Sequence, residues 1–403
     1  MKIVIVCSRL CFGGAERVAV LWANGFHRNG YEVVVVSNLL DPVTYQLDDG
    51  IVLEKLVSVN QNKLKKWLSS FVNVRRVLKK YNPDVIIGVL ATCSFISRVA
   101  SFGLHIPIVA TEHDSFERPA SAPFGFWNRF SKFYLNKLYK HITVLTHADK
   151  KVIGKRLKHV NVMPNPLSLS PVENIPQKQN VVLAMGRLDA WHYKGFDVLI
   201  KAWRHVNGKL KIDNGELSSN GEPWKLQIAG TGSGESLNYL KQLCKENGVE
   251  DTVVFLGFRK DVENLYQDAS IFVLSSRYEG FGLVLIEAMS QGCACVACDY
   301  KGRQREILCP EAPTQVGDSG VQKSNGVQGL NVALQRSNCE VEVCENGILC
   351  EPDNVEALAE AMAKMITNNE YRESVRMNAI GRSKFYAIES TIDRWDLLIK
   401  DLI

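Results

Sequence analysis

The sequence predicts an α/β fold with two Rossmann-like domains, each a doubly wound parallel sheet, that face each other across a cleft. Short apolar runs alternate with helix-spaced stretches, four prolines interrupt this pattern within residues 164–180, and the alternation then restarts. Strands of a parallel sheet are buried on both faces, so they are nearly continuous apolar runs. Such sheets bind ligands beyond the carboxyl ends of their strands, which predicts a ligand cleft between two successive domains.

The size and composition of the chain fit this prediction. It has 403 residues, of which 46% are hydrophobic and 23% charged, as is usual for a globular protein of about two domains. No apolar run approaches the roughly 18 residues that a membrane-spanning helix needs. The N-terminal apolar run continues into patterned sequence, so we expect a strand there and not a signal peptide.

Charge is unevenly distributed along the chain. Residues 1–170 carry 23 Lys and Arg against 11 Asp and Glu, a net +12, whereas residues 171–403 carry 25 against 32, a net −7. The positive first half predicts an anionic surface or ligand near it. We do not expect nucleic acid as a partner, because no nucleic-acid-binding module or base-stacking pattern accompanies the charge.

Apolar runs and helical spacing give the expected elements. The strands are expected at residues 2–8, 32–37, 51–57, 84–90, 106–113, 141–146, 180–186, 225–232, 252–258, 271–276 and 293–299. The clearest helices are expected at residues 15–27, 64–78, 355–368, 370–386 and 391–403.

Three segments interrupt this order. The proline-rich residues 164–180 are expected to link the two domains. Residues 207–223 and 311–346 are rich in Gly, Ser, Asn and Gln and are expected to be surface insertions. The second exceeds the usual length of a connection, which is typical of a functional loop or of partial disorder.

Three of the eleven cysteines fall in one apolar run, at Cys293, Cys295 and Cys298. We interpret them as small core residues and not as a metal or redox site, because the run has no Cys-x2-Cys pair and no nearby His. Reduced cysteines in a chain without an export signal indicate the cytoplasm.

Two segments have features of phosphate binding. Gly13 and Gly14 follow the first strand and open a helix, where free backbone N–H groups can hold a phosphate; a tight turn is the equal alternative. Arg187 and Lys194 follow the strand at 180–186, and two cations at a strand end suit a diphosphate. A solvated loop with unrelated charges is the alternative for that pair. The Gly13-Gly14 pair does not belong to a G-x-G-x-x-G dinucleotide motif.

Two further turns lie at strand ends. The glycine-rich turn at 229–235 predicts contact with a phosphate or base, although a flexible turn is slightly favoured. The backbone of Arg259 and Lys260 is positioned to contact a nucleobase, and Asp261 is expected to cap the next helix.

The strongest signal lies in residues 275–289. Glu279 and Glu287 flank a glycine-rich turn, and a helix is expected from about Phe281. The amides of Phe281, Gly282 and Leu283 would then be free to bind an anion or sugar hydroxyls. The Glu287 carboxylate can accept two hydrogen bonds from a vicinal diol such as ribose. A surface helix face is the alternative, but these surroundings are apolar.

His113 ends the expected strand at 106–113 and is a candidate for hydrogen bonding to a sugar or for proton transfer. Glu112, which points to the opposite side of the strand, is the competing candidate. A purely structural role for the histidine is the alternative.

With these residues in view, the chain resembles the retaining GT-B glycosyltransferases of family 4 over nearly its whole length. The resemblance rests on GGAER, EHD, PNP, GRL…KGFDVLI, IAGTG, FLGF and EGFGLVLIEAM, in the order of the family. The last of these is the family's E-x7-E pattern. The chain departs from the family at residues 301–306, where KGRQRE replaces a Gly-Gly-x-x-Glu pattern, and in the 311–346 insertion.

The resemblance implies an acceptor-side domain of residues 1–168, completed by a C-terminal crossover helix at 390–403, and a donor domain of residues 169–389. It implies that Arg187 and Lys194 hold the donor diphosphate, Glu287 the ribose, and Glu279 the transferred sugar. It also implies Gly14 near the phosphates and His113 beside the reaction centre. Arg259 and the amides of Phe281, Gly282 and Leu283 complete the donor set. The resemblance implies that no metal or other cofactor is needed, because the arginine, the lysine and the helix N-terminus neutralise the leaving diphosphate. The absence of an Asp-x-Asp motif agrees with this expectation.

Two basic and aromatic stretches, residues 62–80 and 124–141, predict contact with an anionic membrane. In the second, one helical face is expected to hold Phe126, Phe130, Phe133, Tyr134 and Leu138, with Arg129, Lys132 and Lys140 elsewhere. An ordinary core helix with a basic solvent face is the alternative.

Together these features predict a cytoplasmic hexosyltransferase-type enzyme, located at the inner face of the membrane. Its donor is expected to be a UDP-sugar and its acceptor a lipid-linked glycan of a bacterial surface polysaccharide. The alternatives are a GT-B nucleotide-sugar epimerase or hydrolase and a non-catalytic protein that binds sugar nucleotides. The sugar, the linkage and the oligomeric state do not follow from the sequence.

Overall fold

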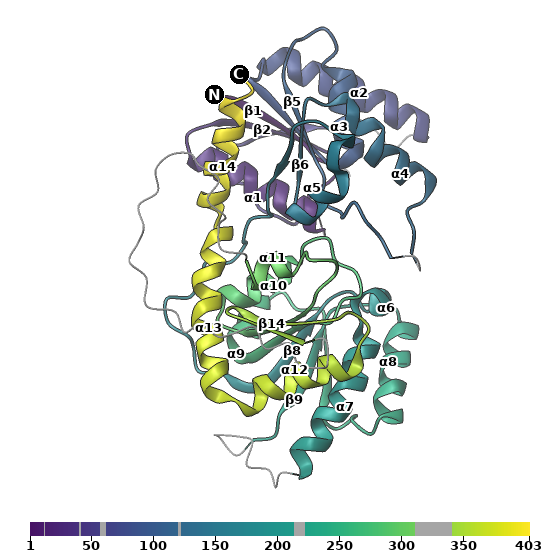
Figure 1. The fold of residues 1–403 in the computed structure, drawn as a ribbon. Helices are drawn as coiled ribbons and strands as arrows, with labels where there is room; N and C mark the ends of the chain where they lie inside the picture. Colours follow the sequence, from purple (N-terminus) through teal and green to yellow (C-terminus); the bar gives the residue numbers. More distant parts are fainter. Residues whose placement is uncertain (12, 40–41, 57–61, 120–121, 213–221, 311–340) are drawn as a thin grey trace. The chain divides into compact units, whose positions relative to one another are not determined.

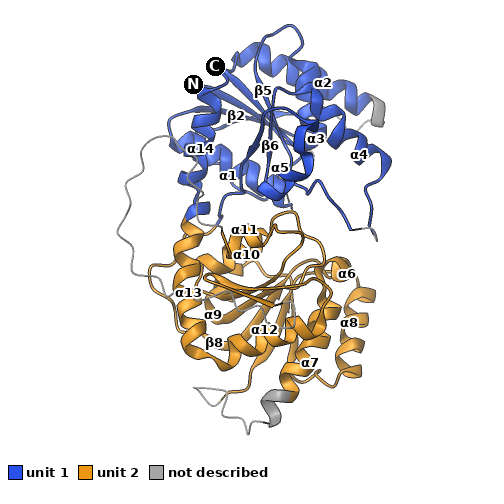
Figure 2. Ribbon diagram, in the orientation of Figure 1, with its two compact units in different colours: residues 1–168, 385–403 blue, residues 169–384 orange. Residues whose placement is uncertain are grey.

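The computed structural model describes residues 1–11, 13–39, 42–56, 62–119, 122–212, 222–310 and 341–403 (Figure 1). The chain divides into two compact units (Figure 2). Unit 1 comprises residues 1–168 and 385–403, and unit 2 comprises residues 169–384. Each unit is an α/β domain with helices on both faces of one sheet (Figure 1), so the predicted fold class is confirmed.

Unit 1 is built on a parallel sheet of seven strands in the order β3-β2-β1-β4-β5-β6-β7. The strands are β1 (Lys2–Val6), β2 (Glu32–Ser37), β3 (Val52–Lys55), β4 (Val85–Val89), β5 (Ile108–Thr111), β6 (His141–Val144) and β7 (Val160–Val162). The first six were predicted. Strand β7 was not, because three residues between a Lys-His pair and a Met-Pro pair are too short for a recognisable pattern.

The helices of unit 1 include the C-terminal segment of the chain. They are α1 (Gly14–Arg28), α2 (Lys63–Tyr81), α3 (Leu90–Ala100), α4 (Phe126–Phe133), α5 (His147–Ile153) and α14 (Ile388–Lys400), with the 3-10 turns η1 (Leu135–Leu138) and η2 (Gly154–Arg156). The single helix expected within residues 124–141 is therefore wrong, because the chain passes from α4 into η1 at Tyr134.

Helix α14 packs on α1 through a close backbone approach. An added Cβ at Gly25 would lie 2.8 Å from Cγ1 of both Ile388 and Ile392, so only glycine fits. Beside this contact Trp395 of α14 meets Trp22 of α1 edge to face, with ring centroids 5.0 Å apart. Both indoles are almost fully buried, so α14 completes the core of unit 1.

Unit 2 also has a seven-stranded sheet, in the order β10-β9-β8-β11-β12-β14-β13. The strands are β8 (Gln179–Met185), β9 (Lys225–Ala229), β10 (Val253–Gly257), β11 (Ala269–Leu274), β12 (Ala294–Cys298), β13 (Val341–Cys344) and β14 (Gly347–Cys350). Strand β13 pairs antiparallel with β14, an edge that was not predicted. The end of the expected 311–346 insertion therefore belongs to the sheet, and residues 311–340 lie outside the described ranges.

The helices of unit 2 surround this sheet. They are α6 (Trp191–Lys194), α7 (Phe196–Ile212), α8 (Gly234–Glu246), α9 (Val262–Asp268), α10 (Leu283–Ser290), α11 (Arg305–Leu308), α12 (Val355–Thr367) and α13 (Asn369–Ser383), with the 3-10 turns η3 (Leu188–Ala190) and η4 (Lys384–Tyr386), the second of which crosses into unit 1. The insertion expected at 207–223 is wrong at its start, since α7 continues to Ile212; residues 213–221 lie outside the described ranges.

The cysteine prediction is partly confirmed. Cys293, Cys295 and Cys298 are buried free thiols of the sheet core. Burial raises the pKa of Cys293 and Cys295, which keeps them protonated and inert. The expectation that all cysteines are reduced is wrong for Cys309 and Cys344, which form a disulfide that joins the α11 end to β13. Their Cα atoms are 5.3 Å apart.

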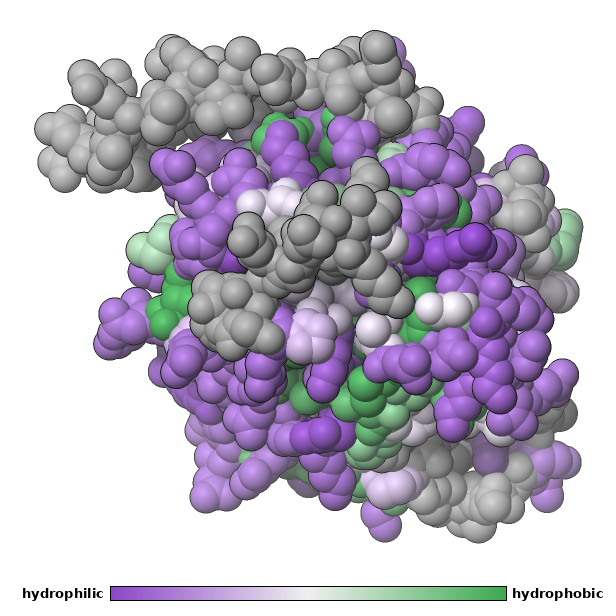
Figure 3. Space-filling model, turned by 90° about the horizontal axis from the view of Figure 1, so that it is seen from below, coloured by the Kyte–Doolittle hydropathy of each residue, from purple (hydrophilic) through white to green (hydrophobic). Residues whose placement is uncertain are grey.

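Further findings concern the apolar character of the helices and of the surface. Among the helices formed by the described residues, none combines the length and apolar character needed to cross a membrane. The face drawn in Figure 3 is mostly hydrophilic, and its hydrophobic residues lie in small separate groups. The larger exposed apolar side chains include several of α4, namely Phe126, Trp127 and Phe130, at 74%, 75% and 37% exposed.

Candidate functional site

Arg187 and Lys194 lie on the segment that follows the carboxyl end of β8. Arg187 is exposed and precedes η3, and Lys194 is the last residue of α6. The stem of Lys194 passes over Gly186, where an added Cβ would lie 3.2 Å from its Cγ. Gly195 has a φ of +65°, and a Cβ there would lie 1.9 Å from the Ser275 carbonyl oxygen. These glycines bring Lys194 against the carboxyl ends of β8 and β11.

Lys194 forms an ion pair with Glu279. Its Nζ lies 2.8 Å from Glu279 Oε2, and Ser276 Oγ donates to the same oxygen at 3.2 Å. The side chains of Lys194 and Glu279 are 25% and 19% exposed, so the pair is accessible to a ligand. The sequence placed these two residues at adjoining parts of one substrate, and the structure brings them into direct contact.

The loop that carries Glu279 is fixed by Arg277, which the sequence analysis missed. The guanidinium donates to both carboxylate oxygens of Asp197, in the first turn of α7, at 2.7 and 2.8 Å. It also donates to Asp353 at 2.8 Å. The hydrogen bond to Asp197 raises the pKa of Arg277, while burial acts less strongly in the opposite direction. This bidentate pairing orients the loop. In the sequence Arg277 is a lone cation before Tyr-Glu-Gly, and nothing there indicated its pairing with Asp197.

Helix α10 begins at Leu283, two residues later than expected, so Phe281 and Gly282 precede it. Gly282 is the N-cap, with a φ of +98° that favours glycine. Phe281 is buried, and its carbonyl oxygen accepts a hydrogen bond from Gln304 at 3.3 Å. The first N–H groups of α10 have no partner within the helix, as the expected anion contact requires.

Glu287 lies in the interior of unit 2. Its side chain is on the buried face of α10, the residue is only 2% exposed, and Tyr266 donates its hydroxyl to Oε2 at 3.1 Å. The sequence predicted a carboxylate that meets a ribose diol and gave no indication of Tyr266. In the structure the tyrosine hydroxyl occupies one of the acceptor positions of this carboxylate.

The two remaining turns of unit 2 are held by their own side chains. Arg259 is held by Asp261 through two hydrogen bonds of 2.8 and 2.5 Å. This pairing lowers the pKa of Asp261. Asp261 is the N-cap residue of α9, as predicted, but its carboxylate makes no capping hydrogen bond. The 229–235 turn is fixed, because Asp189 accepts from the Ser233 amide at 2.7 Å and from the hydroxyl of Ser236 at 2.9 Å.

His113 lies just after β5 in unit 1 and is held from two sides. Nδ1 is 3.2 Å from Asn165 Oδ1, and Nε2 is 3.1 Å from Thr111 Oγ1. The Trp22 ring is 5.3 Å away. Burial lowers the pKa of His113 to about 4, with the Asn165 hydrogen bond acting in the opposite direction. The imidazole is therefore neutral at neutral pH and can serve only as a hydrogen-bonding group or proton acceptor.

Glu112, the competing candidate, has a structural contact. Its Oε2 lies 2.9 Å from Lys132 Nζ, and Asn136 donates to Oε1 at 2.8 Å. Both charged side chains are about 5% exposed, so Lys132 is not on the basic surface where the sequence placed it. This pair and the Asn136 hydrogen bond connect α4 and η1 to the residue that follows β5.

Gly14 is the first residue of α1 and is exposed. The neighbouring Gly13 lies against Glu16, because an added Cβ would be 2.0 Å from Glu16 Oε2. Glu16 is buried and accepts a hydrogen bond from Arg9 at 3.3 Å. A carboxylate of the chain itself thus lies at the helix end where the sequence predicted a phosphate.

The structure brings together only part of the predicted set. Lys194 and Glu279 are in contact, and Glu279 shares the 275–289 segment with Gly282 and Glu287. Arg187 is exposed on the segment that leads to Lys194, whereas Arg259 is engaged with Asp261. His113 and Gly14 belong to unit 1 and the others to unit 2.

Two family models match successive parts of the chain. "Glycosyltransferase Family 4" matches residues 12–170, and "Glycosyl transferases group 1" matches residues 168–325. Together they cover the site segments of both units. The border between the two matches lies beside the border between the two compact units.

Curated relatives and solved structures agree with these matches. An uncharacterized glycosyltransferase of Haemophilus influenzae is 29% identical over 95% of both chains. GalNAc-alpha-(1->4)-GalNAc-alpha-(1->3)-diNAcBac-PP-undecaprenol alpha-1,4-N-acetyl-D-galactosaminyltransferase of Campylobacter jejuni is 26% identical over 100% of this chain and 99% of its own. Anabaena HepE in complex with UDP and glucose has the same fold, with a TM-score of 0.70, 18% identity and full coverage of both chains.

Proposed function

This chain belongs to the GT-B glycosyltransferases of family 4, and we propose that it transfers a sugar from a UDP-sugar, with retention of anomeric configuration, to a lipid-linked glycan. The product would be part of a bacterial surface polysaccharide. Glycosyl transfer is the activity of the family, and the donor, acceptor and stereochemistry are the parts that we propose.

The proposed donor site rests on one observation, the accessible ion pair between Lys194 and Glu279. The ammonium lies at the ends of β8 and β11, paired with Glu279, and a Cβ added at Gly282, the N-cap of α10, would lie 3.7 Å from Glu279 Cγ. A diphosphate that bound there would be neutralised by Lys194, Arg187 and the helix N-terminus. Glu279, released from the lysine, would accept hydrogen bonds from hydroxyls of the sugar.

The relatives support the choice of substrates. The name of the Campylobacter relative specifies a glycan on diphospho-undecaprenol as its acceptor. Anabaena HepE was crystallised with UDP. For this chain, the basic and aromatic surface of α4 supports an acceptor that is held at a membrane, and hence action at the inner face of the cytoplasmic membrane.

The reaction we propose needs positioning and charge stabilisation more than covalent catalysis. The acceptor hydroxyl attacks the anomeric carbon on the face that the diphosphate leaves, and the departing phosphate oxygen takes the hydroxyl proton. Positive charge develops on the sugar and negative charge on the diphosphate, which Lys194 and Arg187 stabilise. His113 would act as a neutral hydrogen-bonding group. We propose no metal, since cationic side chains supply the neutralising charge.

A thermal-shift panel with UDP, GDP, ADP and dTDP tests the donor site. A ligand at about 100 times its Kd stabilises the folded state by about 2.7 kcal/mol, which is roughly 5–10 °C in Tm for a domain of this size. We expect this shift with UDP, and its loss in Lys194→Ala and Glu287→Gln. The exposed α7 residue Lys201 provides the control, Lys201→Ala, which should keep it.

The outcomes separate the candidate functions. A shift with UDP followed by sugar transfer from UDP-sugars to membrane extracts supports the proposal. Release of free sugar without an acceptor would replace it with a hydrolase or epimerase. No shift with any nucleotide would refute the donor site as proposed.

A further inference from the structure

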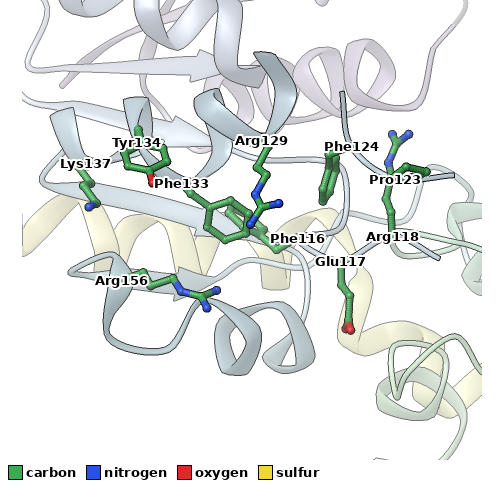
Figure 4. Close-up of a pocket in the computed structure, with 10 residues that line it drawn as sticks. All are labelled: Phe116, Glu117, Arg118, Pro123, Phe124, Arg129, Phe133, Tyr134, Lys137 and Arg156. Carbon is green, nitrogen blue, oxygen red and sulfur yellow. The ribbon is translucent and has the colours of Figure 1, made fainter. Parts of the chain in front are cut away.

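A pocket with a volume of about 560 Å³ lies within unit 1, between the loop after β5, helix α4 and the turns η1 and η2 (Figure 4). Four of its lining residues are cationic, and Glu117 is the single acidic one among the ten. The cations come from different elements and are Arg118, Arg129, Lys137 and Arg156. None of the predicted donor-site residues lines this pocket, so it is a separate feature of the molecule.

Three of the four cations are available to a ligand. Arg118 pairs with Asp114 at 2.8 Å. Within the described ranges, Arg129, Lys137 and Arg156 are exposed and have no carboxylate partner. In Figure 4 the guanidinium groups of Arg129 and Arg156 extend toward the middle of the pocket, and the carboxylate of Glu117 points away from them. The pocket is therefore electropositive and complementary to an anion of more than one charge.

Two of these cations lie over aromatic rings. Arg156 lies over the Phe133 ring at 5.5 Å, and Lys137 over the Tyr134 ring at 5.2 Å. Such cation–π contacts restrict the long side chains before a ligand arrives. The wall also has buried support, because the Lys132 ammonium lies 4.5 Å from the Phe116 ring centroid while paired with Glu112.

The aromatic lining continues out of the pocket along α4. Tyr134 stacks on Phe130 at 5.6 Å, and Phe130 stacks on Phe126 at 6.4 Å. Trp127 meets both phenylalanine rings edge to face. This aromatic strip, Phe126, Trp127, Phe130 and Tyr134, is exposed to solvent, so an apolar chain attached to an anion in the pocket has a surface to lie on.

We propose that this pocket binds the diphosphate of a polyprenyl-diphosphate carrier, with the first isoprene units on the aromatic strip. The proposal rests on the proposed function for the identity of the acceptor, and it assigns the part of unit 1 that recognises it. Guanidinium forks suit phosphate oxygens, and apolar aromatic faces suit an isoprenoid chain. A free sugar phosphate or inorganic diphosphate would use the cations and leave the aromatic strip unused.

Calorimetric titration of the full chain with farnesyl diphosphate, inorganic diphosphate and farnesol, without any sugar donor, tests this. We expect farnesyl diphosphate to bind at least tenfold more tightly than either of the other two. Arg129→Gln/Arg156→Gln should weaken it at least tenfold. Lys150→Gln/Lys151→Gln, which removes two exposed charges of α5 that do not line the pocket, should leave it unchanged.

The strip has its own test. Phe126→Ser/Phe130→Ser should reduce farnesyl diphosphate binding to the level of inorganic diphosphate. Equal binding of inorganic and farnesyl diphosphate to the unaltered chain would overturn the assignment to a prenyl carrier. Farnesyl diphosphate binding that survives Arg129→Gln/Arg156→Gln would overturn the assignment to this pocket.

Failure of this inference is distinguishable from failure of the proposed function. Lys194→Ala should abolish the nucleotide-induced thermal shift and leave farnesyl diphosphate binding intact. Sugar transfer that persists while the chain does not bind farnesyl diphosphate would refute only the pocket. Binding without any transfer from nucleotide sugars would refute only the enzymatic proposal.

Discussion

Removal of Lys132 should destabilise unit 1 by much more than the removal of an exposed lysine. Lys132 and Glu112 are 6% and 5% exposed, and their charged atoms are 2.9 Å apart. In Lys132→Met the Glu112 carboxylate keeps only the hydrogen bond from Asn136 at 2.8 Å. An uncompensated buried charge of this kind costs about 3–5 kcal/mol.

A second variant separates the charge from the packing. In Lys132→Met/Glu112→Gln the buried charge is absent, while the amide oxygen of the introduced glutamine can still accept from Asn136. We expect the double variant to recover about 2 kcal/mol of the loss, because the desolvated carboxylate is the main cost. Lys140→Met, an exposed lysine after η1, should change stability by less than about 0.5 kcal/mol.

Native-state hydrogen exchange of the β5 and β6 amides is the suitable assay, since it reports the opening free energy of unit 1 separately from unit 2. A loss below about 1 kcal/mol in Lys132→Met would refute the reasoning. So would a double variant no more stable than the single one, because the destabilisation would then come from lost packing.

Three other perturbations have definite outcomes. Burial lowers the pKa of His113 to about 4, whereas the pKa in the unfolded state is near 6.5, so the unfolded state binds more protons between pH 4 and 6.5. The free energy of unfolding should therefore fall as pH falls through that window. Urea titrations of His113→Gln at several pH values should lack this contribution to the pH dependence of stability. Gly25→Val should force apart α1 and α14, which should lower the Tm of unit 1 and cost about 1–3 kcal/mol of stability. In the control Gly381→Ala in α13, an added Cβ meets nothing within 4 Å, so stability should rise by about 0.5–1 kcal/mol. A loss of stability in both variants would contradict the role given to Gly25. In denaturant without reductant, Cys309 and Cys344 should resist alkylation and Cys298 and Cys350 should react; peptide mass spectra that show all four alkylated would exclude the disulfide.

The fold was predictable because its signal is local. A continuous apolar run such as residues 33–36 is typical of a strand that is buried on both faces, as in a parallel sheet. Strands β7, β13 and β14 escaped prediction. Strand β7 is three residues long, and β13 and β14 are four-residue strands after a long polar segment, so none has a recognisable pattern.

The candidate site was predictable only as a set of residue types. Glycines before α10 and cations after β8 mark strand ends in the sequence itself. Their partners come from distant segments, so Tyr266 beneath Glu287, Asn165 beside His113 and Asp197 beneath Arg277 had no sequence signal. Lys132 also resembled a surface residue, because its partner Glu112 lies in a distant segment and gave no sequence signal.

The sequence by itself determined the two α/β domains, the family and the residues of chemical interest, because periodicity and motif spacing are properties of neighbouring residues. Only the tertiary structure decided which charges are neutralised and which remain accessible. Lys132 is buried against Glu112, while Arg129, three residues earlier, lines an open pocket. The reason is physical: the free energy of a charged side chain depends on its solvent exposure and its partners, and both are set by contacts between segments far apart in the chain.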